Sequence, residues 1–308
     1  MQILVLGAGA LGGYFGGKLL EGGANVEFLV RPRRAAQLRE CGLIVKTQEG
    51  EIRRPARTVQ AGGISGTYDA VLLSCKAYDL DDAMDAIAPA VTGDCVVVPV
   101  LNGVRHIDVL SERFGKNHVF GGLTAVNAAL MPDGEIVQSA VRVDMTGFGE
   151  LDGTVSARCL ALQTAFAAGG MKADASATIM ASMWTKFVAF GCIAAIASLI
   201  RARAGAIARA AGSRALVDAV LDETFRVAAA EGYKPPDGIR DTVRALYAQP
   251  DSTYGPSILV DMENGRTTEG EHTIGDLVDR ASKHGVSVPI LAAARTNLQV
   301  YEAGRIKA

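Results

Sequence analysis

The apolar positions at the start of the chain predict a buried strand followed by a helix. The run Ile3–Leu6 is wholly apolar, and it leads through a glycine-rich segment into a stretch of helical character that ends near Glu21. A second strand is predicted at Asn25–Val30. A strand, a helix and a second strand at this spacing are typical of the unit from which parallel sheets are built. The chain therefore opens with the first unit of a parallel sheet.

Further apolar runs continue this pattern. They lie at Asp69–Cys75 and Cys95–Leu101, and the segment Asp79–Ala90 between them has the composition of a helix. The alternation of strands and helices predicts a doubly wound parallel sheet. The remaining elements expected in this domain are short strands within residues 119–149, including Arg142–Phe148, a helix at Val155–Ala168 and a strand at Met171–Ala175.

From Thr178 onward the pattern changes to segments of helical length. Prolines and glycines separate these segments, as is usual between helices. The predicted helices are Thr178–Ile200, Arg214–Glu231, Gly238–Ala248, Ser257–Asn264, Thr273–His284 and Pro289–Ala303. The change predicts an α/β domain in residues 1–170 and an all-helical domain in residues 171–308.

The glycine-rich segment after the first strand has the sequence Gly-Ala-Gly-Ala-Leu-Gly, residues 7–12. Gly7 permits a tight turn, Gly9 lets backbone amides approach a pyrophosphate, and Gly12 allows the helix to lie close to the sheet. The anion would meet free N–H groups at the positive end of the helix dipole. Between a strand and a helix, this motif predicts an N-terminal Rossmann dinucleotide-binding domain. We expect the cofactor to contact the backbone of Gly7, Gly9, Ala10, Leu11 and Gly12.

The end of the second strand indicates which dinucleotide is bound. NAD-dependent enzymes usually place Asp or Glu there, where the carboxylate binds the ribose 2′-hydroxyl. This chain has Arg31-Pro32-Arg33-Arg34 instead. A guanidinium group suits a 2′-phosphate, which a carboxylate would repel. We therefore expect NADPH, with Arg31 as the main contact and Arg34 as a lesser one. The alternative is that the arginines belong to a solvated loop.

Composition and charge narrow the class of partner. The chain has 308 residues, 49% of them hydrophobic, and its formal net charge of −2 offers no basic surface for nucleic acid. A small molecule is therefore the expected ligand, and neither nucleic acid nor a membrane is. The five cysteines and four histidines form no CxxC or HExxH motif, so no metal site is expected.

The apolar segments also bear on location. The apolar run at the N-terminus belongs to a strand and lacks a charged leader, so we expect no signal peptide and a cytoplasmic protein. The longest uncharged run, Phe187–Ile200, is too short to span a bilayer. It is predicted to be part of a buried helix.

Three polar residues stand where they could act on a bound molecule. Lys76 and Asn102 directly follow two predicted parallel strands, at the edge where such sheets bind ligands. Lys186 stands near the start of a helix that carries no other charge through Ile200. Its ammonium could donate a proton to a carbonyl oxygen as hydride arrives, and desolvation would help by lowering its pKa. The alternatives are a solvated Lys76, a simple turn at Asn102, and a Lys186 that extends to water from the helix end.

A polar cluster accompanies the predicted helix Ser257–Asn264. Ser257 and Asp261 share one face of this helix. Glu269 lies beyond Gly265, which is expected to end the helix, so its carboxylate could reach a ligand or a lysine. A structural role in capping the helix is the alternative.

Five motifs together resemble the ketopantoate reductase (2-dehydropantoate 2-reductase) family over essentially the whole chain. They are the glycine-rich segment, Cys-Lys-Ala at 75–77, Leu-Asn-Gly at 101–103, Trp-Thr-Lys at 184–186 and Ser-x-x-x-Asp-x-x-x-Gly-Arg-x-Thr-Glu at 257–269. The resemblance implies a Rossmann domain followed by a helical domain for substrate binding and dimerisation. It also implies NADPH-dependent reduction of 2-dehydropantoate to pantoate, in the pathway to pantothenate, by a protein that is often a homodimer.

The same resemblance implies roles for single residues. Lys186 matches the catalytic lysine, which acts as general acid, and Glu269 matches the glutamate that assists it. Ser257 matches a serine that contacts substrate. Asn102 matches the asparagine at the junction of nicotinamide and substrate, and Lys76 matches the lysine on the cofactor side.

Two segments depart from the family pattern. At 269–275 the family's Glu-Ile-Asp-x-Ile-Asn-Gly is Glu-Gly-Glu-His-Thr-Ile-Gly here, which loses an amide. Family members usually carry asparagines four and eight residues after the catalytic lysine, and this chain has Phe190 and Ala194 there. Each polar group of the substrate that is left without a hydrogen-bond partner would weaken binding by roughly 1–3 kcal/mol. The alternatives to ketopantoate reduction are therefore reduction of another, more apolar 2-oxo acid, and a non-catalytic NADPH sensor. Retention of Lys186 and Glu269 argues against the sensor.

Overall fold

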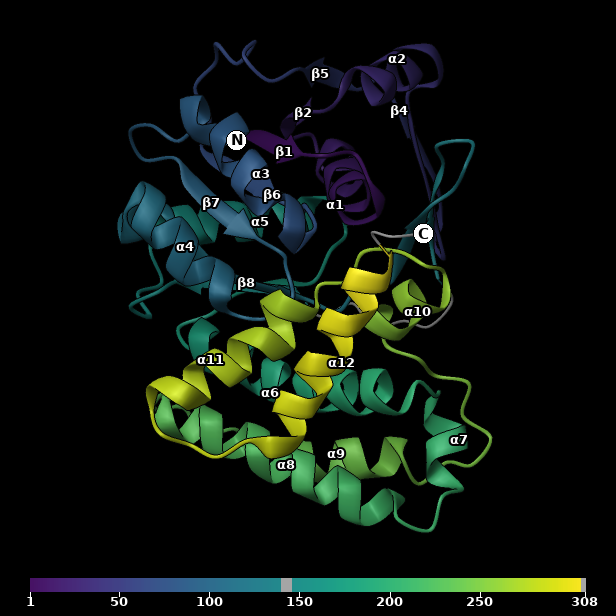
Figure 1. Cartoon of the computed structure of the whole chain (residues 1–308). Coiled ribbons are helices and arrows are strands. Elements are labelled where there is room, and N and C mark those ends of the chain that lie inside the picture. Colours follow the sequence, from purple (N-terminus) through teal and green to yellow (C-terminus); the bar gives the residue numbers. More distant parts are fainter. Residues whose placement is uncertain (140–145, 306–308) are drawn as a thin grey trace. The chain divides into compact units, whose positions relative to one another are not determined.

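The computed structural model describes residues 1–139 and 146–305, which form two compact units (Figure 1). Unit 1 comprises Met1–Leu101 and His106–Met180. Unit 2 comprises Asn102–Arg105 and the chain from Ala181 onward. The four residues Asn102–Arg105 thus belong with the helices of unit 2, although they follow a strand of unit 1.

The central sheet of unit 1 has five parallel strands in the order β5-β2-β1-β6-β7. They are β1 (Gln2–Leu6), β2 (Asn25–Leu29), β5 (Arg57–Val59), β6 (Ala70–Leu73) and β7 (Val96–Pro99). The chain runs outward from β1 to β5 and returns to β6 and β7, so the winding reverses between β1 and β6. The doubly wound sheet predicted from the sequence is confirmed, and ligands of such sheets bind outside the carboxyl ends of the strands at this reversal.

Two smaller sheets complete unit 1, in the orders β4-β3-β10-β9 and β12-β11-β8. Their strands are β3 (Leu43–Thr47), β4 (Gly50–Arg54), β8 (Phe120–Thr124), β9 (Ala128–Leu130), β10 (Ile136–Gln138), β11 (Thr146–Glu150) and β12 (Ala173–Ala175). The hairpin of β3 and β4 was missed by the sequence analysis. The predicted strand Arg142–Phe148 coincides with β11 only from Thr146, and its earlier residues lie outside the described part of the chain.

Helices cover the sheets of unit 1 (Figure 1). The helices and 3₁₀ turns are α1 (Ala10–Glu21), α2 (Pro32–Cys41), η1 (Ala77–Asp79), α3 (Leu80–Ile87), η2 (Ala88–Ala90), α4 (Arg105–Phe114), η3 (Lys116–His118) and α5 (Ala157–Ala168). Phe15 of α1 packs edge-on against Phe166 of α5 at 6.0 Å between ring centroids, and Phe148 of β11 packs against Phe166 at 5.7 Å. These buried rings join α1 and α5 to the sheets.

The division between the units falls after Met180 rather than near residue 170. β12 pairs with β11, so the chain remains part of a sheet of unit 1 through Ala175. Ile179 then packs against β11, where its side chain would contact a Cβ placed on Gly149 at 3.4 Å. Strand pairing and this apolar contact keep residues 171–180 in unit 1.

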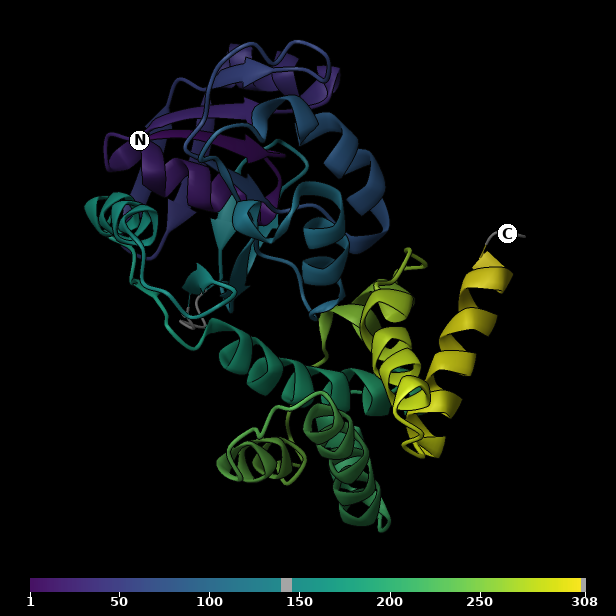
Figure 2. The same cartoon turned by 90° about the vertical axis from the view of Figure 1, so that its left-hand side faces the viewer.

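The described secondary structure of unit 2 is wholly helical, as predicted. Its elements are α6 (Ile179–Ile200, from Ala181), α7 (Ala204–Ala208), α8 (Ser213–Ala230), α9 (Gly238–Leu246), α10 (Ser257–Glu263), the π-helical turn η4 (Glu271–Gly275), α11 (Asp276–Lys283) and α12 (Pro289–Arg305). Helix α8 lies beside α9, and α11 lies beside α12 (Figures 1 and 2). The buried carboxylate of Glu223 accepts hydrogen bonds from the backbone N–H groups of Ile290 and Leu291, which fixes the start of α12 on α8.

Helix α6 corresponds to the predicted helix Thr178–Ile200. It spans 22 residues and includes Lys186, so it is longer than the uncharged run Phe187–Ile200 within it. By length and composition alone α6 could cross a membrane, but 61% of its apolar window is buried within the structure. Such burial is what the core helix of a folded domain also shows.

The turn between β1 and α1 depends on glycine. Gly7 has φ +84°, a left-handed conformation that side chains disfavour. A Cβ on Gly12 would lie 2.2 Å from the carbonyl oxygen of Gly7 and 2.5 Å from Ser74 Oγ. A Cβ on Gly9, by contrast, would meet no atom within 4 Å. Helix α1 can therefore begin this close to the sheet only with glycine at position 12, whereas position 9 borders open space.

We expect Gly12→Ala to lower the free energy of unfolding by about 1–3 kcal/mol, because the added methyl group collides with backbone that cannot yield. Gly9→Ala is the matched control and should change this free energy by no more than about 0.5 kcal/mol. Urea unfolding followed by circular dichroism measures both. Equal stability of the two variants would contradict the assigned close approach of α1 to β1.

Candidate functional site

Three polar side chains meet within unit 2 in the candidate catalytic group. Lys186 lies on α6, Asn102 lies in the short segment that follows β7, and Glu269 lies two residues before η4. The Lys186 Nζ donates a hydrogen bond to Asn102 Oδ1 at 3.2 Å. The carboxylate of Glu269 acts on Lys186 through its charge. The structure thus brings together three residues that are widely separated in the sequence.

The environment of Lys186 weakens its hold on the proton. Burial lowers the pKa of Lys186 to about 8, and the negative charge of Glu269 opposes that shift. The neighbouring Trp184 and Phe187 are almost fully buried, with ring centroids 5.6 Å apart. A lysine with this pKa is still mainly protonated at neutral pH, yet it releases a proton more readily than a lysine in water.

His272, which the sequence analysis did not single out, also belongs to this group. It lies on η4, three residues after Glu269. Burial lowers the pKa of His272 to about 4; the charge of Glu269 and a hydrogen bond with the backbone of Asn102 oppose this shift, and Arg105 adds to it. The imidazole is therefore neutral at physiological pH. The available signal was a histidine three residues after Glu269, just beyond the motif at 257–269.

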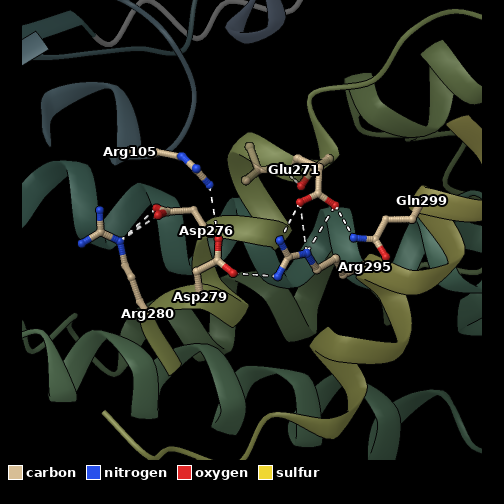
Figure 3. Close-up of polar contacts among 9 residues, drawn as sticks. Arg105, Glu271, Asp276, Asp279, Arg280, Arg295 and Gln299 are labelled. Carbon is tan, nitrogen blue, oxygen red and sulfur yellow. Dashed lines mark hydrogen bonds and ion pairs between the residues drawn. The ribbon is translucent and has the colours of Figure 1, made fainter. Parts of the chain in front are cut away.

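A network of ion pairs surrounds η4 (Figure 3). Arg295 of α12 contacts Glu271 of η4 and Asp279 of α11, each at 2.7 Å. Asp279 also pairs with Arg105 at 3.3 Å, and Gln299 donates to Glu271 at 2.9 Å. Asp279 is shared between Arg105 and Arg295, which come from different segments, whereas Glu271 is held by Arg295 and Gln299 of the same helix, α12. The network therefore ties the segment that carries Asn102 to the turn that follows Glu269.

Ser257 occupies the first position of α10 and is exposed. In the described part of the chain it has no hydrogen bond to Asn102, Lys186 or Glu269. Asp261, one turn along α10, lies 4.0 Å from Arg266. The predicted contact of Ser257 with substrate stays a prediction.

The two positions where the family pattern is broken differ in accessibility. Phe190 lies one turn beyond Lys186 on α6 and is partly exposed. Ala194 lies a further turn along and is 0% exposed. An asparagine at position 194 would bury an amide, so only Phe190 presents surface that a substrate could contact in this structure.

Except for Asn102, which belongs to unit 2, the residues predicted to bind the dinucleotide lie in unit 1, near the carboxyl ends of β1, β2 and β6. Gly7, Gly9, Ala10, Leu11 and Gly12 form the turn after β1 and the start of α1. Lys76 follows β6, the neighbour of β1, and its side chain is exposed. The open space at Gly9 and the N-terminus of α1 fit a pyrophosphate, because backbone N–H groups there can approach an anion.

Arg31 and Arg34 have different surroundings. The Arg31 side chain is 82% exposed directly before α2, and its guanidinium lies 3.7 Å from Asp79. Arg34, within α2, donates to the carbonyl oxygens of Ala8 and Gly134, each at 3.0 Å. Arg34 is therefore engaged in holding the glycine-rich turn, and the lesser cofactor contact expected from it stays a prediction. The run is the start of a helix and not a solvated loop.

Within residues 1–139 and 146–305, no group of three or more His, Cys, Asp and Glu side chains is arranged to hold a metal ion.

Two family matches cover most of the chain. Residues 3–153 match the family described as "Ketopantoate reductase PanE/ApbA", and residues 178–302 match "Ketopantoate reductase PanE/ApbA C terminal". The chain is 34% identical over 305 residues to "Uncharacterized oxidoreductase YkpB" of Bacillus subtilis, covering 98% of this chain and 99% of that relative.

Solved structures share the fold along the whole chain. The 2-dehydropantoate 2-reductase of Methylococcus capsulatus superposes with a TM-score of 0.89 at 26% identity, covering 100% of this chain and 99% of that one. A D-mandelate dehydrogenase with NADH and anilino(oxo)acetate superposes with a TM-score of 0.87 at 21% identity, covering 99% of this chain and 100% of that one. The resemblance inferred from the five motifs is confirmed: the chain is an oxidoreductase that belongs to the ketopantoate reductase family.

Proposed function

We propose that this protein reduces the keto group of a 2-oxo acid to a hydroxyl group, with NADPH as the hydride donor and Lys186 as the proton donor. The observation that carries the proposal is the partly buried Lys186 ammonium, hydrogen-bonded to Asn102 and influenced by the charge of Glu269. A sensor that only bound the dinucleotide would have no use for an ammonium group in this state.

The chemistry needs a hydride and a proton. When bound, NADPH supplies the hydride to the keto carbon. Negative charge develops on the keto oxygen, and the Lys186 ammonium stabilises it and transfers a proton to it, which yields the 2-hydroxy acid. Asn102 orients the ammonium by accepting its hydrogen bond. Glu269 favours the charged form of the lysine, so the proton is replaced after each turnover.

The preference for NADPH rests on Arg31. Its guanidinium is exposed at the end of β2, where a dinucleotide-binding sheet places the group that contacts the adenosine ribose. The backbone of Gly9 and the residues beside it would hold the pyrophosphate, and Lys76 would add a positive charge on the cofactor side. The D-mandelate dehydrogenase of similar fold binds NADH, so the choice between the two nucleotides is a property to be measured here.

2-Dehydropantoate is the first candidate substrate, because the solved relative from Methylococcus capsulatus carries that activity in its name. A 2-oxo acid with a larger apolar side chain is the second. It is favoured by Phe190, which stands one turn from Lys186 where an amide would otherwise bind substrate oxygens. The D-mandelate dehydrogenase of the same fold, with its aromatic 2-hydroxy acid, provides a precedent.

We expect kcat to fall about tenfold per pH unit above a pKa near 8, because the proton donor is the charged form of Lys186 and is lost as pH rises through that value. Lys186→Ala should lower kcat by about 10²–10⁴-fold with little change in NADPH affinity. It should also abolish the fall of kcat at high pH, which is the basic limb of the pH profile. Initial rates with each 2-oxo acid between pH 6 and 10 measure both effects.

Lys283→Ala, which removes an exposed lysine of α11 in the same unit, is the control and should retain both the rate and the limb. Turnover by Lys186→Ala at the rate of the unsubstituted protein would exclude Lys186 as the proton donor.

We expect Arg31→Ala to weaken NADPH binding by about 10–100-fold and to leave NADH binding nearly unchanged, because a charged hydrogen bond to phosphate contributes about 1.5–3 kcal/mol. Arg33→Ala, an exposed neighbour on α2, should alter neither affinity. Fluorescence titration with each nucleotide gives the dissociation constants. If Arg31→Ala keeps the same preference for NADPH over NADH, Arg31 does not bind the 2′-phosphate.

The substrate is identified by comparing 2-dehydropantoate with 2-oxo-2-phenylacetate. If the apolar candidate is correct, the protein should favour the phenyl acid, and Phe190→Asn should raise kcat/KM for 2-dehydropantoate several-fold by adding a hydrogen bond worth about 1 kcal/mol. Phe190→Leu, which stays apolar, is the control. Efficient use of 2-dehydropantoate by the unsubstituted protein would instead select the first candidate.

A further inference from the structure

We propose that His272 is a positioning residue for the reduction: its imidazole holds the backbone of Asn102, so that the Asn102 side chain stays aligned to accept the hydrogen bond from Lys186. The inference rests on the proposed function, in which Lys186 donates the proton. The contact between His272 and Asn102 does not depend on which substrate is bound, and it can be tested without one.

The turn at Asn102 and Gly103 is held from two sides. The imidazole of His272 forms a hydrogen bond with the backbone of Asn102. Next to it, Gly103 has φ +84°, and a Cβ there would lie 3.4 Å from the carbonyl oxygen of His272 and 3.6 Å from Cε2 of Phe187. The turn therefore sits between η4 and α6. Phe187 is the residue after Lys186, so the same turn that carries Asn102 packs beside the catalytic lysine.

The charge state of His272 suits this position. The charges that act on its ring are Glu269, which favours the imidazolium, and Arg105, which disfavours it. Burial outweighs Glu269, so between about pH 4 and about pH 8 the ring is uncharged while Lys186 is an ammonium. A second cation here would repel the ammonium, whereas a neutral imidazole supplies a hydrogen bond without adding charge.

The surroundings of His272 keep it in place. It lies on a π-helical turn, a rare conformation that often occurs at functional sites. On this turn, Glu271 is anchored to Arg295, and Arg295 is joined through Asp279 to Arg105, three residues after Asn102 (Figure 3). Both partners of the His272–Asn102 contact are therefore tied to the same network of ion pairs.

The experiment compares His272→Leu, which removes the hydrogen bond, with His272→Asn, which retains an N–H group near the ring position. His284→Gln is the control, because His284 follows α11 and pairs with Glu231 instead. For each variant we would measure kcat and KM for NADPH and the substrate, the pH profile of kcat, and the melting temperature of the full chain.

We expect His272→Leu to lower kcat about tenfold, as for loss of one hydrogen bond at the reacting group, with KM for NADPH changed less than about twofold. The basic limb of its pH profile should move to lower pH, because the Lys186 ammonium loses a well-placed acceptor. His272→Asn should recover part of the rate and the limb. Unchanged kcat and limb in His272→Leu would overturn the proposal. The proposal would also be overturned if His272→Leu lowered kcat without moving the basic limb of the pH profile, and His272→Asn recovered none of that rate.

A measurement without substrate separates this proposal from the function on which it rests. The Lys186 pKa can be followed by NMR in protein labelled with ¹³C at lysine Cε, with Lys186→Ala to assign the signal. A lower Lys186 pKa in His272→Leu supports the positioning role even if neither 2-oxo acid is reduced, an outcome that would count against the proposed reaction alone. An identical Lys186 pKa in both proteins overturns the positioning role whatever the substrate.

Discussion

The arrangement of unit 2 depends on the presence of one ammonium group on an otherwise uncharged helix. Lys186 has lost much of its hydration on α6, and a desolvated cation is costly unless other groups replace the water. α6 itself offers no anion, so the compensation comes from Asn102 and Glu269, which are supplied by two other segments. The placement of these segments, and of the ion pairs that fix them, can be understood as the means of keeping this charge in an apolar setting.

The parts of the fold that the sequence predicted are those in which neighbouring residues decide the outcome. The strand, glycine turn and helix at the N-terminus follow from apolar runs and from one close approach between Gly12 and Gly7, both of them local. The helices after Thr178 were found for the same reason, since apolar periodicity and proline or glycine breaks lie within each segment. The three residues of the candidate group were found separately, by their types and their places at strand or helix ends.

The parts that were missed depend on contacts between residues far apart in the chain. The hydrogen bond from Arg34 to the carbonyl oxygen of Gly134 could not be predicted, because the turn between β9 and β10 reaches α2 only in the folded chain. The sequence predicted that Phe187–Ile200 lies in a buried helix, but the packing around α6 decides that Phe190 stays partly exposed and Ala194 does not. His272 belongs to the site because it contacts the turn at Asn102 and Gly103, which lies far earlier in the sequence.

The segment Asn102–Arg105 follows β7 of unit 1 and yet belongs to unit 2. A single cut in the gene therefore cannot separate the two units. A gene fusion that joined the region after Met180 to a different nucleotide-binding domain would carry Lys186, Glu269 and His272 with it. It would leave behind the asparagine that accepts the lysine's hydrogen bond. The units are compact in space but each is not one continuous piece of sequence, and we expect recombination at their main junction to keep the hydrogen bond of Lys186 only if the incoming domain brings an equivalent Asn-Gly turn.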